Sequence, residues 1–238
     1  MVFNIRRIFT GFLILLSCIF FYISQFDYIF FIIINLFIFL DLKILALNNK
    51  KIFYFFLYIY LISLIFFYNF SYNYNLFLFI ILLLVFFTFI SKKYLSFLFI
   101  IIILLFSIFL LNLIKHDRNL FYLIIFISFL NDSFAYFFGN LLKGPLILPS
   151  VSPKKTWSGT SISFFLSSII LWHYGYTIII SAFLSISLFF GDIYFSFIKR
   201  KLKLKDFSNS LGSHGGALDR LDSMFLLTII ITSITFNL

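Results

Sequence analysis

Long, unbroken apolar segments recur from one end of this 238-residue chain to the other, and they constrain its fold more than any other feature. Each run has about 16 to 22 apolar residues, which is enough to cross the hydrocarbon core of a bilayer as a helix. Only α-helices and closed β-barrels satisfy every backbone hydrogen bond in lipid. The runs are continuously apolar and do not alternate with polar residues, so they favour helices. The sequence therefore predicts an all-α fold, a polytopic transmembrane helical bundle.

The apolar runs predict about nine spans. Asp41 and Lys43 lie near the end of the second run, and the first run follows Arg6 and Arg7 in the manner of a signal peptide. Because apolar residues continue past Cys18 without a polar linker, we expect an uncleaved first helix and not a cleaved leader. The expected spans are about residues 8–24, 28–47, 52–68, 76–90, 94–114, 120–139, 160–174, 177–198 and 222–238.

The basic residues fall almost entirely on one side of the membrane when these spans are placed in order. Of the 18 Lys and Arg residues, only Lys115 and Arg118 fall on the other side. Cytoplasmic loops carry the excess of Lys and Arg, so we expect the amino terminus and the loops 140–159 and 199–221 to be cytoplasmic. A net charge of +10 can also indicate nucleic-acid binding. Here the positive charge lies in short loops, where the excess of Lys and Arg in cytoplasmic loops explains it. We therefore expect no nucleic-acid partner.

Glycine and proline divide the chain into two parts. Residues 1–119 contain one glycine, Gly11, and no proline, whereas all three prolines and the other eight glycines lie between residues 139 and 216. Irregular backbone at membrane depth is tolerated where it is buried in protein or lines a cavity. Within one integral membrane domain, we therefore expect residues 1–119 to be hydrophobic scaffold helices and residues 120–238 to be the catalytic transmembrane region.

The sixth predicted span carries a polar face. Ser128, Asp132, Ala135 and Gly139 are spaced i, i+4, i+7 and i+11, which places them on one side of a helix. A carboxylate deep in a span costs about 3 kcal/mol on insertion scales and usually faces a site or a partner. A helix-packing stripe of small and polar residues is the alternative interpretation. We favour a functional carboxylate, because an aspartate exceeds what packing requires.

Two later segments predict a metal site. Asp192, Ser196 and Lys199 share one helical face at i, i+4 and i+7, and Asp219 and Asp222 are spaced i and i+3. Magnesium is held by one or two carboxylates together with substrate phosphates and water. We therefore expect Asp192 and Asp219, from neighbouring helices, to bind Mg²⁺. An ion pair within the eighth span is the alternative role for Asp192.

A basic segment before the seventh span predicts a phosphate site. Ser152 is a suitable N-cap and Pro153 suits the first helical position, so we expect a helix to begin there. Its free backbone N–H groups and the ammonium groups of Lys154 and Lys155 would then converge on one anion. An ordinary basic anchor at the membrane surface is the alternative.

A second turn, before the ninth span, has the composition of a phosphate-binding loop. Gly215 and Gly216 allow the backbone to approach a phosphate closely or to adopt positive φ. His214 beside them is a candidate hydrogen-bond donor to phosphate, although a single loop histidine is often incidental.

Together these residues resemble the phosphatidate cytidylyltransferase family, the CDP-diacylglycerol synthases. The resemblance covers residues 131–223, and before them only hydrophobicity agrees. The matching residues are Asn131, Asp132, Ala135 and Tyr136; Ser152 to Thr156; Ser196, Lys199, Arg200, Lys205 and Asp206; His214, Gly215 and Gly216; and Asp219, Arg220 and Asp222. The chain departs from the family pattern at Ser158, where Glu is usual, and at Gly212 and Ser213, where Pro-Gly is usual.

The resemblance implies a nucleotidyltransferase of phospholipid biosynthesis. Its substrates would be CTP and phosphatidate, and its products would be CDP-diacylglycerol and pyrophosphate. It also implies Mg²⁺, with or without a second cation, a homodimer, and contact with membrane lipids. Combined with the predicted topology, it places the protein in the bacterial inner (cytoplasmic) membrane with the active site facing the cytoplasm.

The resemblance, together with the carboxylate positions described above, predicts roles for the site residues. The catalytic residues would be Asp192, Asp219, Lys199 and Arg200. The metal ligands would be Asp192, Asp219 and Asp222, with Asp132 in support. The substrate-binding residues would be Asn131, Asp132, Ser152, Lys154, Lys155, Thr156, Ser196, Lys205, His214, Gly215, Gly216 and Arg220.

Three alternatives to this function remain open from the sequence. A CTP-dependent lipid kinase would transfer the γ-phosphoryl group instead of the cytidylyl group. A cation-coupled transporter would use Asp132 and Asp192 as intramembrane cation ligands and would consume no nucleotide. An inactive family member is the third alternative, motivated by Ser158.

Overall fold

The computed structural model describes residues 16–45, 83–86, 88–90, 95–208, 210 and 215–236, and this part of the chain is mostly helical. Residues 16–24 and the two short segments between residues 83 and 90 are helical. The longer helices are α2 (Asp27–Leu45), α5 (Leu95–His116), α6 (Arg118–Leu142), α7 (Trp157–Tyr174), α8 (Ile178–Lys201) and α9 (Leu218–Phe236).

These helices follow the predicted spans closely. The differences are confined to the ends, the largest being at α9, which begins at Leu218 and not at residue 222. The expected span 52–68 and His214 lie outside the described residues. Within the described part, three helical segments are long and apolar enough to cross a membrane: Leu98–His116, Arg118–Leu142 and Ile178–Lys201.

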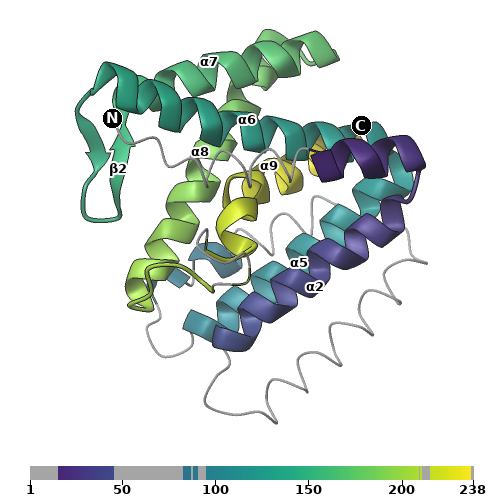
Figure 1. The fold of residues 1–238 in the computed structure, drawn as a ribbon, viewed down its shortest axis with the longest axis horizontal. Helices are drawn as coiled ribbons and strands as arrows, with labels where there is room; N and C mark the ends of the chain where they lie inside the picture. The colour runs from purple at the N-terminus through teal and green to yellow at the C-terminus, as the bar shows by residue number, and fades with distance from the viewer. Residues whose placement is uncertain are drawn as a thin grey trace.

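The helices form two packed groups that meet at α9 (Figure 1). In this view α6 and α7 lie side by side at the top, α8 runs downward from them, and α2 and α5 lie side by side at the lower right. The helix α5 packs against α2, α6 and α9, and Phe99 and Phe106 on it are fully buried. Phe106 meets Phe225 of α9 edge to face, with 5.5 Å between ring centroids. The early helices thus support α9 directly.

The expectation of a helix beginning at Ser152 was wrong. Residues Ser152–Thr156 form strand β2, which pairs antiparallel with β1 (Leu146–Leu148), so a hairpin stands among the helices of the described residues. The residue before a proline is pushed to extended backbone, and this favours strand geometry at Ser152. Thr156 is the actual N-cap: its hydroxyl accepts a hydrogen bond from the backbone N–H of Gly159 at 3.3 Å, and α7 begins at Trp157.

Glycines set the closest helix contacts. A Cβ on Gly159 of α7 would collide with the carbonyl oxygen of Ala135 and lie 2.9 Å from the nitrogen of Gly139, both on α6. A Cβ on Gly191 of α8 would lie 2.7 Å from the carbonyl oxygen of Asp222 on α9. Small residues let membrane helices approach closely. The predicted Ala135 and Gly139 face of α6 is therefore a packing face toward α7.

Substituting Gly159→Ala should lower the stability of the helix pair. The added methyl group meets backbone atoms that cannot rotate away, and overpacking of this kind costs about 1–3 kcal/mol. Thermal unfolding of the purified protein in detergent measures the effect. Ser161→Ala, on the exposed side of the same helix, is the matched control and should change stability by less than about 0.5 kcal/mol. Equal midpoints for both variants would contradict the close contact.

Candidate active site

Three aspartates from three helices come together beside α9 and are called the aspartate cluster: Asp132 of α6, Asp192 of α8 and Asp222 of α9. Each interacts electrostatically with the other two. The hydroxyl of Ser223 donates to Oδ2 of Asp132 at 3.4 Å and forms a 2.6 Å hydrogen bond with Ser128. The half of the α6 polar face that carries Ser128 and Asp132 therefore faces α9, as a functional carboxylate requires.

Two lysines bring positive charge into this cluster. Lys155 of β2 forms a salt bridge with Asp192, and it also interacts with Asp132 and Asp222. Lys199 of α8 is buried, with its Nζ 2.7 Å from Oδ1 of Asp219 and 4.0 Å from Oδ2 of Asp222. The hairpin and α8 thus each supply one ammonium group to the same group of carboxylates.

Lys155 keeps its charge because of the carboxylates around it. Burial alone would lower the pKa of its ammonium group. The neighbouring Asp192, with smaller contributions from Asp132 and Asp222, outweighs burial and raises that pKa above its ordinary value. Lys154, the preceding residue, is exposed, because successive side chains of a strand point to opposite faces. Only one of the two predicted lysines therefore reaches the cluster.

Asp219 is occupied by contacts that hold the segment between α8 and α9. Its Oδ2 accepts hydrogen bonds from the backbone N–H groups of Phe207 and Gly216, both at 2.9 Å, while Oδ1 binds Lys199. Lys199 interacts electrostatically with both Asp219 and Asp192 and so connects the two carboxylates. A role for Asp219 as a metal ligand stays a prediction.

The other predicted substrate-binding residues lie around this centre in different settings. Asn131 is buried on α6, the hydroxyl of Ser196 donates to Oδ1 of Asp192 at 3.4 Å, and Arg220 interacts electrostatically with Asp132. Lys205 is exposed. Arg200 donates to the carbonyl oxygens of Val151 at 3.1 Å and Leu204 at 3.3 Å, so it braces the hairpin turn.

The two described glycines of the predicted phosphate loop have distinct roles. Gly215 has φ of +84°, the left-handed conformation expected for it. A Cβ on Gly216 would lie 2.8 Å from Oγ of Ser208 and would collide with Oδ2 of Asp41. The missing side chain of Gly216 therefore makes room for a carboxylate from α2.

Asp41 and Ser223 are the neighbours of this site that the motif pattern missed. Asp41 is fully buried on α2 and contacts the segment before α9. An aspartate within an apolar run was a usable signal, since such a residue usually faces a partner. Ser223 carries no comparable signal in the sequence.

Ser158, where Glu is usual in the resembling family, has structural contacts. Its hydroxyl accepts from the backbone N–H of Gly144 at 3.2 Å and lies 3.3 Å from the hydroxyl of Thr156. It therefore ties the start of the hairpin to the start of α7.

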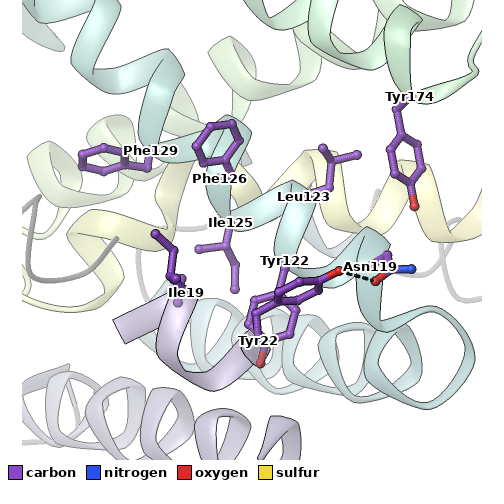
Figure 2. A pocket seen from close by; sticks show the side chains of 10 residues that line it. Ile19, Tyr22, Asn119, Tyr122, Leu123, Ile125, Phe126, Phe129 and Tyr174 are labelled. Carbon is purple, nitrogen blue, oxygen red and sulfur yellow. Dashed lines mark hydrogen bonds between the residues drawn. The ribbon is translucent and has the colours of Figure 1, made fainter. Parts of the chain in front are cut away.

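A cavity of about 500 Å³ lies elsewhere, between the helix at residues 16–24, the first half of α6 and the end of α7 (Figure 2). Its described lining is mainly apolar, with Tyr22 and Asn119 hydrogen-bonded at one end at 3.2 Å. Asp132 lies beyond the α6 residues that line it. The charged side chains of the aspartate cluster therefore do not line this cavity.

The donor chemistry of the cluster suits a hard cation. Among the described residues no group of three or more His, Cys or Asp side chains is arranged to hold a metal by itself. Magnesium does not need such a group, because it binds through one or two carboxylates plus phosphate oxygens and water. The like charges of Asp132, Asp192 and Asp222 repel one another, and a bound cation would relieve that repulsion.

Comparison with known proteins identifies the family of the chain. The sequence profile of the cytidylyltransferase family matches residues 4–237. The chain belongs to the cytidylyltransferase family. Bacterial relatives of this chain include the phosphatidate cytidylyltransferases of Rickettsia bellii, 40% identical over 111 residues, and Aquifex aeolicus, 40% identical over 124 residues. The first alignment covers 40% of this chain and 48% of the relative, and the second covers 48% of each. The chain therefore spans about half the length of these relatives.

Replacing Asp219→Ala should loosen the segment before α9. The substitution leaves the N–H groups of Phe207 and Gly216 without their acceptor, at a cost of about 1–3 kcal/mol for each buried unsatisfied group. Hydrogen exchange at these two amides should accelerate and the thermal midpoint should fall. Asp206→Ala, an exposed carboxylate on the same segment, is the control. Unchanged amide exchange in Asp219→Ala would show that these contacts do not hold the segment.

Proposed function

We propose that this protein transfers the cytidylyl group of CTP to phosphatidate, giving CDP-diacylglycerol and pyrophosphate. The observation that carries the proposal is the convergence of Asp132, Asp192 and Asp222 with Lys155 and Lys199, in a chain of the cytidylyltransferase family. The relatives' name, phosphatidate cytidylyltransferase, supports the choice of substrates.

In the proposed reaction, a phosphate oxygen of phosphatidate attacks the α-phosphorus of CTP. The bond from that phosphorus to the oxygen bridging the α- and β-phosphates breaks, and pyrophosphate leaves. The lipid phosphate is already ionised near neutral pH, so it needs no general base. The protein's task is then to align two anionic substrates and to offset their charge.

The residues of the site divide this task by charge. Lys155 and Lys199 are placed to neutralise phosphate oxygens, with Lys154, Arg200 and Arg220 as further phosphate-binding candidates nearby. Asp192, Asp219 and Asp222 are the proposed magnesium ligands, and Asp132 supports them. Magnesium would supply charge neutralisation on the phosphates and on the leaving oxygens. Lys155 and Lys199 lie beside these carboxylates and offset part of their negative charge.

We further propose nine spans, a cytoplasmic amino terminus, and an active site facing the cytoplasm of the bacterial inner membrane. The support is the distribution of Lys and Arg, which assigns the hairpin and the segment before α9 to the cytoplasmic side. CTP is a cytoplasmic nucleotide, so this orientation suits the reaction. The homodimer stays a prediction that rests on family resemblance.

Labelled CTP tests the reaction directly. Purified protein with phosphatidate and Mg²⁺ should transfer label from the α-phosphate of CTP to lipid, and label in the γ-phosphate should appear only in pyrophosphate. Lipid labelled from the γ-phosphate would instead identify a lipid kinase. Ion flux without nucleotide consumption would identify a transporter, and no product from either label would indicate an inactive member.

The variant Asp192→Ala should lower kcat/KM by about 10²-fold or more, because it removes a proposed ligand of the magnesium ion that would neutralise the reacting phosphates. Asp117→Ala is the matched control, since Asp117 caps the start of α6 by accepting from Leu120 N–H at 3.0 Å. Both variants lose a carboxylate, but only the first should lose turnover. Near-normal turnover in Asp192→Ala would remove this residue from the mechanism.

Metal removal should abolish turnover reversibly. Chelation of divalent cations in the assay should stop labelled liponucleotide formation, and added Mg²⁺ should restore it. The variant Asp222→Asn should need a higher Mg²⁺ concentration for half-maximal rate, since it weakens the negative field at the cluster. Turnover that is indifferent to chelation would rule out the metal role.

A further inference from the structure

Asp41 is a buried carboxylate far from the site residues in sequence but adjacent to them in space. It lies near the end of α2 with none of its surface exposed. The hydroxyl of Ser208 donates to its Oδ1, at 2.5 Å, and the backbone N–H of Leu218 donates to its Oδ2, at 2.7 Å. Both oxygens therefore act as acceptors, as an ionised carboxylate does.

The hydrogen bond from the N–H of Leu218 to Asp41 caps the amino-terminal end of α9. Leu218 is the first residue of α9, and the first N–H groups of a helix have no partner within the helix. The residues before it, Gly215, Gly216 and Ala217, have no side-chain oxygen that could accept these hydrogen bonds. The carboxylate of Asp41 takes that role from a different helix, and the positive end of the α9 dipole favours its negative charge.

The space for this carboxylate depends on Gly216. Any side chain at that position would collide with Oδ2 of Asp41. Gly216 also donates its N–H to Asp219, so one residue connects the two carboxylates. From Asp219 the chain of contacts continues to Lys199 and then to Asp222 in the aspartate cluster. The first turn of α9 is therefore held in place both by Asp41 and by residues of the site.

We propose that Asp41 is a positioning residue for the active site: it caps α9 from α2 and holds the turn that carries Asp219 and Asp222 in place. This inference rests on the proposed function only in that the positioned residues serve catalysis. The helices before residue 120 then contribute to the geometry of the site as well as to its support.

The test compares Asp41→Asn with Asp27→Asn in the full-length protein. Both residues lie on α2 and both make tertiary contacts: Asp27 pairs with Arg118 at 3.0 Å and accepts from the hydroxyl of Tyr122 at 2.8 Å. They are 14 positions apart, about 21 Å along a helix, so Asp27 is remote from the α9 cap. Steady-state kinetics with CTP and phosphatidate, together with hydrogen exchange at the amides of Gly216 and Leu218, are measured for each variant.

Asp41→Asn should lower kcat by about tenfold or more, with KM values changed by about twofold or less, since small misplacements of reacting groups lower the rate steeply. Exchange at Gly216 and Leu218 should accelerate. Ser208→Ala, which removes one donor to Asp41 and leaves the carboxylate, should change both quantities in the same direction by less. Asp27→Asn should leave kcat and these amides unchanged, whatever its effect on the thermal midpoint.

The proposal is overturned if Asp41→Asn and Ser208→Ala retain wild-type kcat and amide protection, or if Asp27→Asn lowers kcat as much as Asp41→Asn does. Should Asp41→Asn fail to fold, Ser208→Ala decides alone. If the wild-type protein does not turn over CTP and phosphatidate, the proposed function fails. The exchange at Leu218 then decides the role of Asp41 separately, and unchanged exchange rejects it.

Discussion

Carboxylates in an apolar helical bundle need compensating partners, and this requirement organises the structure around α9. A buried charge that loses its partner is strongly destabilising, whereas a paired and hydrogen-bonded one is tolerated. Here Lys155 comes to Asp192 from the hairpin, and Lys199 comes to Asp219 and Asp222 from α8. These ion pairs hold the hairpin and the turn before α9 in position. Ligand binding at the site would exchange one set of ionic contacts for another.

The aspartates near α9 separate into two kinds by the partners they have. Asp132, Asp192 and Asp222 interact with one another and with lysines, an arrangement that favours cations and phosphates. Asp41 and Asp219 accept hydrogen bonds from the backbone N–H groups of Phe207, Gly216 and Leu218 and so hold the backbone, while the second oxygen of Asp219 binds Lys199. Rigid support of this kind would matter for the proposed reaction, which relies on alignment and needs no covalent step from the protein.

Helix positions could be predicted from the sequence because a continuous apolar run of sufficient length admits few other structures in lipid. The hairpin could not, because Ser152 and Pro153 are as suitable for a helix start as for a strand. The partners of Asp219 and Asp222 could not be predicted from the sequence either. Their i and i+3 spacing predicts a shared face. The carboxylate of Asp219, however, accepts hydrogen bonds from N–H groups whose positions depend on how the chain folds between α8 and α9.

The motif glycines illustrate why spacing alone cannot separate chemistry from packing. Gly216 was expected to let the backbone approach a phosphate closely or adopt positive φ, and the structure shows that the space beside its Cα holds Asp41. Gly191, next to Asp192, lets α8 approach the backbone of α9 at Asp222, which brings the two carboxylates together. A glycine required for helix contact and a glycine required for substrate contact leave the same pattern in the sequence. Because the contact here also positions the carboxylates, packing at these two glycines is itself a condition for the proposed chemistry.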